Sequence, residues 1–181
     1  MTNAVDLTPL IQAIHAAPQR LVYVFAGAGS LALHWLHAVA GSSRTLLEAR
    51  DCYASRSLAA VLGAPPVRAV SVETASAMAD WAWHYATSLA EGPWPLLGVG
   101  CTAAIVTDRA RRGADRAVVA VRSASGTRIY ELLLARERRD RAGEEALISR
   151  LVILAIAEAC GLGEVRLDLE PGEALRLAGM T

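Results

Sequence analysis

A glycine-rich turn between an apolar strand and an apolar helix carries the most suggestive chemistry of the sequence. Gly27 and Gly29 can adopt positive φ and let the backbone approach a ligand closely. The helix that we expect to begin near Ser30 would present free N–H groups and the positive end of its dipole, which favour an anion such as phosphate. The alternative is a tight connection whose small residues serve packing alone, because two glycines are a weak motif.

Reactive side chains outside this turn are few. Cys101, beside Thr102 at the end of an apolar strand, would be a nucleophile only if a base or a cation lowered its pKa. No such partner is identifiable, so a small buried residue is the simpler interpretation. His34 and His37 lie three residues apart without an acid or a cysteine at ligand spacing. We expect them to be core or interface residues, and we expect neither a metal nor another cofactor.

Arginine is the cation of this chain, since all 18 basic residues are Arg. Chemistry that needs a lysine amine, such as a Schiff base or the P-loop phosphate contact, is therefore excluded. Four arginines form a basic loop after the Gly100 strand: Arg109, Arg111, Arg112 and Arg116. A solvated loop is the ordinary interpretation of such a run. Its position, however, leads us to predict that one of them contacts a phosphate bound at the Gly27 turn.

Composition limits the remaining possibilities. The chain has 181 residues, 54% hydrophobic and 20% charged, with zero formal net charge, so we expect one globular domain over residues 1–181 without affinity for nucleic acid. The longest apolar run, residues 151–157, is far shorter than the ~18 residues of a membrane span, so no membrane association is expected. Three widely spaced cysteines indicate reduced thiols, which are typical of a cytoplasmic protein.

Hydrophobic periodicity divides the chain into alternating strands and helices. We predict helices over residues 8–17, 30–38, 54–62, 71–89 and 144–159, and strands over residues 21–25, 45–53, 96–99, 117–122 and 128–135. Residues 165–169 are interpreted as an edge strand, and residues from 171 onward as a short helix or a frayed tail. The charged run 136–145 is interpreted as a solvated loop together with the start of the helix at Glu144. The resulting sheet would be mixed.

The long helix after Ser71 is unusually rich in aromatic residues. Small residues form its apolar stripe, and Trp81, Trp83 and Tyr85 lie beside that stripe. They either widen the buried face or form a subunit interface, where large aromatic side chains are enriched.

Three motifs then follow one another in a recognisable order. They are Val39-Ala-Gly-Ser-Ser43, Tyr53 with the later Leu62-Gly63, and Ala69-Val-Ser-Val-Glu-Thr-Ala-Ser-Ala-Met-Ala79. In these motifs, over roughly residues 10–162, the chain resembles the CinA C-terminal domain, a family that includes bacterial nicotinamide-mononucleotide amidohydrolases. The resemblance implies a three-layer α/β/α sandwich around a mixed sheet of about five strands. It also implies a homodimer.

The departures from the family pattern fall on the chemistry. The family's A-E-S-C-T-G-G loop places its key serine at Ala26 and its glutamate at Phe25, and the family lysine falls on Leu58. The second family loop, T-G-I-A-G-P-G-G, falls on residues 100–106 and loses its Gly/Pro pattern. The amidase hydroxyl is therefore missing. The chain looks like a divergent branch of the family.

What remains predicts one cleft at the carboxyl ends of the strands. Its expected ligand-binding residues are Ala26, Gly27, Ala28, Gly29, Ser30, Glu48, Tyr53, Gly100, Cys101, Thr102, Arg112 and Arg116. The first hypothesis is a domain that binds a phosphorylated pyridine-type mononucleotide without amidase activity. The alternative is an active nicotinamide-nucleotide amidohydrolase in which Ser30 or Thr102 replaces the missing serine and Tyr53 orients the substrate.

Overall fold

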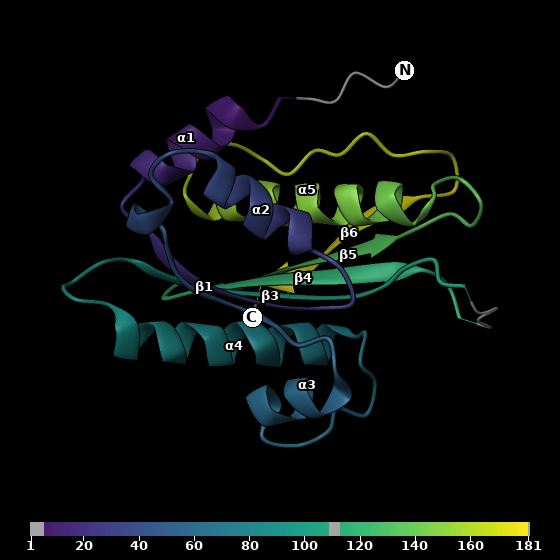
Figure 1. The fold of residues 1–181 in the computed structure, drawn as a ribbon, viewed down its shortest axis with the longest axis horizontal. Helices are drawn as coiled ribbons and strands as arrows, with labels where there is room; N and C mark the ends of the chain where they lie inside the picture. The colour runs from purple at the N-terminus through teal and green to yellow at the C-terminus, as the bar shows by residue number, and fades with distance from the viewer. Residues whose placement is uncertain (1–5, 109–112, 181) are drawn as a thin grey trace.

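Strand-forming and helix-forming segments alternate along the chain, and the computed structural model assembles them into one sheet covered on both faces (Figure 1). It describes residues 6–108 and 113–180. The helices within these residues are α1 (Thr8–Ala16), α2 (Ser30–Ala38), α3 (Ser55–Leu62), α4 (Val72–Leu89) and α5 (Arg141–Ala159), with a 3-10 helix η1 (Ser42–Arg44). The strands are β1 (Arg20–Ala26), β2 (Leu46–Asp51), β3 (Leu96–Ala104), β4 (Arg116–Ser123), β5 (Gly126–Leu133) and β6 (Ala174–Met180).

The sheet is mixed, as predicted, and its six described strands follow the order β2-β1-β3-β4-β5-β6. β1 runs parallel to both β2 and β3, whereas the pairs from β3 to β6 are antiparallel. Ala26 at the end of β1 pairs with Thr102 of β3, and Phe25 pairs with Asp51 of β2. The carboxyl ends of three parallel strands therefore meet beside the turn after β1.

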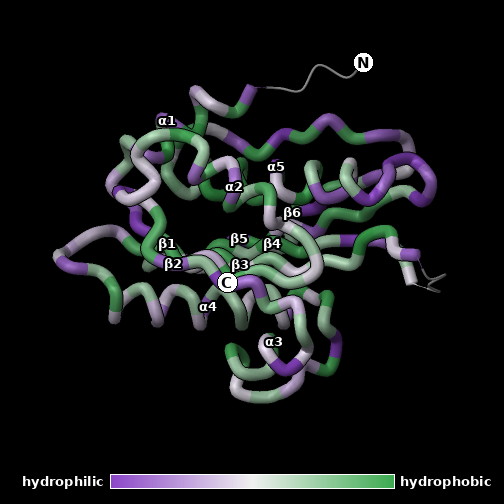
Figure 2. The backbone as a smooth tube through the Cα atoms, in the orientation of Figure 1, coloured by the Kyte–Doolittle hydropathy of each residue, from purple (hydrophilic) through white to green (hydrophobic). Residues whose placement is uncertain are grey.

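Helices cover both faces of the sheet, which gives the three-layer sandwich (Figure 1). α1, α2 and α5 lie on one face, and α4 with α3 lies on the other. Alternation along the strands divides the core accordingly: Phe25 of β1 packs with the first layer, and Val24 packs with the second. Figure 2 shows the hydrophobic residues gathered along the sheet and the hydrophilic ones concentrated in the outer loops.

α4 packs directly against the backbone of β3, because two positions of that strand, Gly98 and Gly100, carry no side chain. A Cβ at Gly98 would lie 2.0 Å from the carbonyl oxygen of Ala79, and a Cβ at Gly100 would lie 2.4 Å from that of Ala75. The helix begins where the sequence predicted, since the Ser71 hydroxyl accepts a hydrogen bond from the N–H of Thr74. Small residues on both elements thus hold the second layer against the sheet.

The C-terminal region corrects three predictions. Residues 165–169 are not a strand: Val165, Leu167 and Leu169 pack as an irregular segment against the core on the α5 side. The sixth strand is β6, which pairs with β5 where a helix or a frayed tail was expected. α5 begins at Arg141, before the start predicted at Glu144, because the Asp140 side chain accepts from the N–H of Gly143 and caps the helix.

Within the described residues, no helix has the length and apolarity needed to span a bilayer.

Candidate functional site

A cleft of about 410 Å³ lies at the carboxyl ends of the parallel strands, between the turn after β1 and the start of α5. Its lining combines apolar, aromatic and charged side chains from four separate parts of the chain. The lining residues are Phe25, Gly27, Ala28, Ser30, Asp51, Tyr53, Ile105, Arg141, Ala142 and Glu145. Of the residues predicted for ligand binding, the structure therefore brings Gly27, Ala28, Ser30 and Tyr53 to one cleft.

The turn that forms one wall of the cleft depends on its glycines. Gly27 and Gly29 both have positive φ, at 88° and 109°. A Cβ on Gly27 would lie 2.0 Å from the carbonyl oxygen of Ala103, and one on Gly29 would lie 2.3 Å from the hydroxyl of Tyr23. That hydroxyl donates a 3.0 Å hydrogen bond to the Gly29 carbonyl and fixes the turn from below. Only glycine satisfies both the conformation and the space at these positions.

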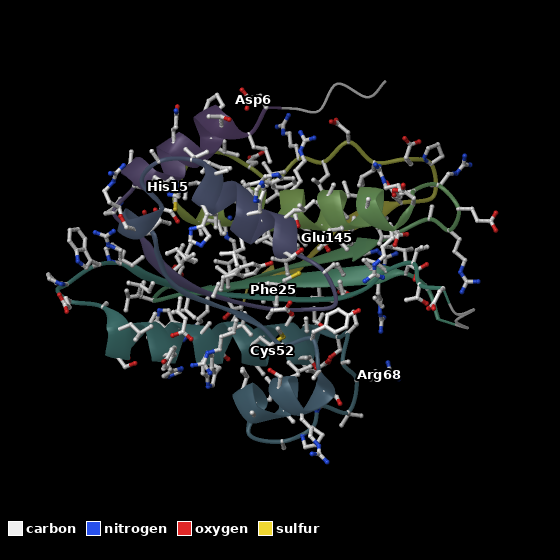
Figure 3. The ribbon with its side chains drawn as sticks, viewed as in Figure 1. Asp6, His15, Phe25, Cys52, Arg68 and Glu145 are labelled. Carbon is white, nitrogen blue, oxygen red and sulfur yellow. The ribbon has the colours of Figure 1, made fainter. Side chains whose placement is uncertain are left out.

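The carboxylate of Glu145 caps the start of α2 (Figure 3). It accepts hydrogen bonds from the N–H of Gly29 at 3.0 Å, the N–H of Leu31 at 3.1 Å and the hydroxyl of Ser30 at 3.0 Å. The Ser149 hydroxyl, one turn along α5, also donates to it. The prediction that this helix terminus offers unpaired N–H donors is therefore wrong, because a negative side chain of the same chain already occupies the place proposed for phosphate.

Three further polar groups surround the cleft. Asp51 ends β2, and the ring of Tyr53, whose residue is 71% exposed, stands two residues beyond it. Arg141 lies in the first turn of α5 and donates a 2.7 Å hydrogen bond to the carbonyl of Val106. The described cleft thus has two carboxylates, from Asp51 and Glu145, and one guanidinium.

The carboxylates of the cleft also affect two ionisable groups beneath the turn, Tyr23 and Cys101. Burial raises the pKa of Tyr23 well above its ordinary value, and the nearby Cys101, Glu145 and Asp51 raise it further. Burial likewise raises the pKa of the Cys101 thiol to about 12, with Glu145 adding to the effect. Cys101 is fully buried, and its Sγ lies 3.6 Å from the carbonyl oxygen of Ala28. It is a protonated thiol that supports the turn, as the packing interpretation held, and it does not line the cleft.

Two residues of β3 that we expected in the cleft, Gly100 and Thr102, lie outside it. Successive residues of a strand face opposite sides of the sheet, and these two face α4. Gly100 faces α4, where a Cβ would touch the backbone of Ala75. Thr102 is 1% exposed and donates a 2.6 Å hydrogen bond to the carbonyl of Ala69 in the loop before α4. Neither residue reaches the cleft, so Thr102 cannot act there as a substitute hydroxyl.

The charged residues predicted for the site are also separated from it. Glu48 lies on the edge strand β2 and forms a 2.6 Å ion pair with Arg50. Arg116 donates to the carbonyl of Val70 near the start of α4. Ala26 contributes to the core beneath α3 and α4. Arg112, with Arg109 and Arg111 of the basic loop, lies outside the described residues.

His34 and His37 are exposed on α2, so the expectation that they are core residues is wrong, and a role in an interface stays a prediction. The residues that the structure describes contain no group of three or more His, Cys, Asp or Glu side chains suited to a metal. Trp81 and Tyr85 stack on each other with ring centroids 4.8 Å apart. The guanidinium of Arg50 lies over both rings. They are half-buried on α4, and a subunit interface at this place stays a prediction.

Sequence reasoning missed the groups that give the cleft its charge: Asp51, Arg141 and Glu145. Glu145 was predicted only as part of the first turn of a helix, and it is 116 residues from Gly29, to which it bonds. One local signal was available. Asp140-Arg-Ala-Gly has a capping residue followed by a helical run, which places the helix start before Glu144 and puts Arg141 and Glu145 on one helix face.

Neither a protein-family model nor a curated protein matches the sequence. Solved structures do match the fold. A CinA superfamily protein of Enterobacter cloacae has a TM-score of 0.70 at 14% identity, covering 88% of this chain and 95% of the other. A CinA superfamily protein of Escherichia coli has a TM-score of 0.67 at 15% identity, covering 90% and 94%. A competence/damage-inducible protein of Agrobacterium tumefaciens has a TM-score of 0.64 at 17% identity, covering 86% and 95%.

The chain is thus a CinA-like domain in its fold, as the sequence resemblance implied. At these identities the likeness concerns the fold, and function has to be argued from the site.

Proposed function

We propose that this CinA-like domain binds a phosphorylated pyridine-type mononucleotide in the cleft beside Gly27, without hydrolysing its amide. The observation that carries the proposal is the cleft itself. Its volume of about 410 Å³ falls in the range of about 300–1,000 Å³ typical of small-molecule sites. It lies at the carboxyl ends of parallel strands, where open α/β sheets bind ligands, and it combines apolar walls with a few polar groups.

The hydrogen bonds around Glu145 support binding over catalysis. Amide hydrolysis needs N–H donors aimed at the oxyanion that forms when the carbonyl is attacked. The N–H groups of Gly29 and Leu31 donate instead to Glu145. The serine position of the related amidohydrolases falls on Ala26, which packs in the core. A ligand in this cleft would meet polar side chains but few free backbone donors.

The proposal is tested by titration calorimetry with nicotinamide mononucleotide. Ala142 lines the cleft from the exposed side of α5, so Ala142→Trp would fill the cleft without disturbing the core. Ala60 is exposed on α3 outside the described cavities, and Ala60→Trp is the matched control. We expect Ala142→Trp to weaken binding at least tenfold and Ala60→Trp to leave it unchanged. Equal affinities of the two variants would reject this cleft as the site.

One observation favours the alternative, an active nicotinamide-nucleotide amidohydrolase. The Ser30 hydroxyl lines the cleft and donates to Glu145 Oε1 at 3.0 Å, which is the arrangement of a nucleophile with a proton acceptor. The Ser30 oxygen would attack the amide carbonyl while Glu145 takes the hydroxyl proton and passes it to the departing nitrogen, which leaves as ammonia. Water would then hydrolyse the resulting acyl-serine to the free acid and restore Ser30.

Ammonia release separates the two functions. On the alternative, the wild type produces ammonia from nicotinamide mononucleotide, Ser30→Ala abolishes it, and Thr102→Val on the opposite face leaves it intact. We expect no ammonia from any of the three proteins. Release that depends on Ser30 would establish the amidohydrolase.

The half-buried aromatic residues of α4 support a homodimer as the functional assembly. Arg50, Trp81 and Tyr85 form a cation–aromatic cluster of the residue types enriched at the centres of interfaces. Light scattering at micromolar concentration is expected to give about twice the chain mass of 19.1 kDa. A mass equal to that of one chain would reject the dimer.

A further inference from the structure

We infer that the cleft imposes a direction on its ligand: the uncharged or cationic end that donates hydrogen bonds lies inward at Glu145, and the anionic end lies outward at Arg141. This inference rests on the proposed function and specifies the chemistry of the ligand. It reverses the orientation that the glycine-rich turn suggests on its own, in which phosphate would lie on the helix terminus.

The inner end of the cleft carries a negative side chain, Glu145. The anion that complements the positive end of α2 is supplied by the chain itself, since Glu145 accepts from Gly29, Ser30 and Leu31. A phosphate or carboxylate entering here would stand beside a fixed negative charge without the N–H donors that would stabilise it. Like charges at close range in a partly buried site repel strongly. The inner wall therefore rejects anions.

A second carboxylate, that of Asp51, adds to the negative charge of the cleft. Asp51 ends the strand next to β1 and lines the same cleft as Glu145. Both carboxylates act on the Tyr23 hydroxyl beneath the turn and contribute to its raised pKa. Phe25 adds an aromatic wall beside them. Two acceptors next to an aromatic ring favour a planar group that carries N–H donors or a positive charge.

The outer end of the cleft carries a positive side chain, Arg141. Arg141 and Glu145 are four residues apart on α5, so they share one helix face and lie one turn apart. An arginine in the first turn is electrostatically unfavourable, because the dipole of the helix prefers acids there. Arg141 nevertheless lines the cleft, and one of its five N–H donors goes to the Val106 carbonyl. The remaining donors suit a phosphate at the mouth of the cleft.

The consequence is a preference for an amide over a carboxylate at the inner end, combined with a preference for a phosphate at the outer end. Four ligands separate the two preferences: the ribosides and the mononucleotides of nicotinamide and of nicotinic acid. They share one pyridine ring and differ only in amide against carboxylate and in the presence of the phosphate. Calorimetric titration of all four gives each preference as a ratio of affinities.

We expect the wild type to bind each amide at least about tenfold more tightly than the matching acid. Glu145→Gln, which keeps an acceptor but removes the charge, should reduce that ratio at least fivefold. Asp51→Asn removes the second negative charge of the cleft, at an exposed strand end and without changing the cap of α2. This variant should also reduce the ratio of amide to acid affinity. Arg141→Gln should weaken the mononucleotides about tenfold relative to the ribosides and leave the amide-to-acid ratio unchanged. The matched control is Arg138→Gln, exposed and outside the cleft.

The outcomes distinguish this inference from the proposed function. If the ligands bind, but amide and acid bind equally to the wild type, or Arg141→Gln behaves like Arg138→Gln, the orientation is wrong and the binding function stands. If none of the four ligands binds at millimolar concentration, the proposed function fails and the orientation fails with it.

Discussion

Gly27 shows how one residue determines the shape of the cleft. Its positive φ alone would cost an alanine about 1–2 kcal/mol, and its missing side chain leaves room for the Ala103 carbonyl, 2.0 Å from where a Cβ would be. We expect Gly27→Ala to lower the free energy of unfolding by about 3 kcal/mol, because the strain and the backbone overlap act together. Urea denaturation measures the loss.

Gly63 is the control for this prediction. It also has positive φ, but a Cβ there would meet nothing within 4 Å. Gly63→Ala should therefore cost only about 1–2 kcal/mol. Equal losses for the two variants would mean that the close approach to Ala103 does not contribute.

His15 gives the molecule a pH-dependent element of stability. The ring is buried, and both of its nitrogens are engaged, Nδ1 with the Thr45 hydroxyl at 2.8 Å and Nε2 with the Leu36 carbonyl at 2.9 Å. Because a carbonyl only accepts, Nε2 carries the proton and Nδ1 is the acceptor in the neutral ring. Burial lowers the pKa of His15 below 6.5, and the charge of Arg44 lowers it further.

The sign of the effect follows from proton binding. The unfolded chain titrates near pH 6.5 and the folded one at lower pH, so the unfolded state binds more protons in between. The free energy of unfolding should therefore fall as the pH drops below about 6.5. Denaturation at about pH 7.5 and pH 5.5 should show a smaller loss in His15→Gln than in the wild type. His34→Gln, on the exposed side of α2, should behave as the wild type does. If His15→Gln loses as much free energy of unfolding between the two pH values as the wild type does, His15 is not the source of the pH dependence.

At the scale of elements, the contact between α4 and β3 sets the thickness of the second layer. Gly98→Ala would place a methyl group 2.0 Å from the Ala79 carbonyl oxygen and 2.3 Å from the backbone nitrogen of Trp83. The helix would have to move away from the sheet, so we expect a loss of about 1–3 kcal/mol in the free energy of unfolding. Gly113→Ala, where a Cβ would meet nothing within 4 Å, should stay within about 0.5 kcal/mol of the wild type. If thermal or urea denaturation gives the two variants the same free energy of unfolding, the close contact between α4 and β3 does not make Gly98→Ala destabilising.

Elements with a clear local signal were predictable from the sequence. The apolar run of β1, the glycine turn and the Ser71 cap each specify their own conformation through neighbouring residues. The C-terminal region has no such local determinant. Residues 165–169 alternate as a strand would, yet their apolar side chains are partly buried against the α5 side of the core, and β6 forms the sheet edge instead. Which of two short apolar segments joins an edge is decided by tertiary packing.

At the scale of the whole molecule, tertiary packing also decides which of the residues predicted for ligand binding lie together in the cleft. Gly27, Ala28, Ser30 and Tyr53 lie near the ends of adjacent parallel strands, which topology alone brings together. Because side chains alternate along β3, Thr102 lies on the α4 face of the sheet, away from the cleft. Glu145 reaches the turn from a helix more than a hundred residues away, and no local pattern specifies that contact. The charge of the cleft is therefore a property of the assembled layers.

Binding of a mononucleotide in the cleft beside Gly27 is tested most directly by amide chemical-shift mapping. The labelled protein is titrated with nicotinamide mononucleotide, and the shift of each backbone amide is followed. Binding in the cleft predicts shifts that cluster at residues 27–31, at Tyr53, at Ile105 and at residues 141–145. Shifts concentrated instead along the cavity of about 690 Å³ between α1, α2 and α5, or an unchanged spectrum at millimolar ligand, would contradict it.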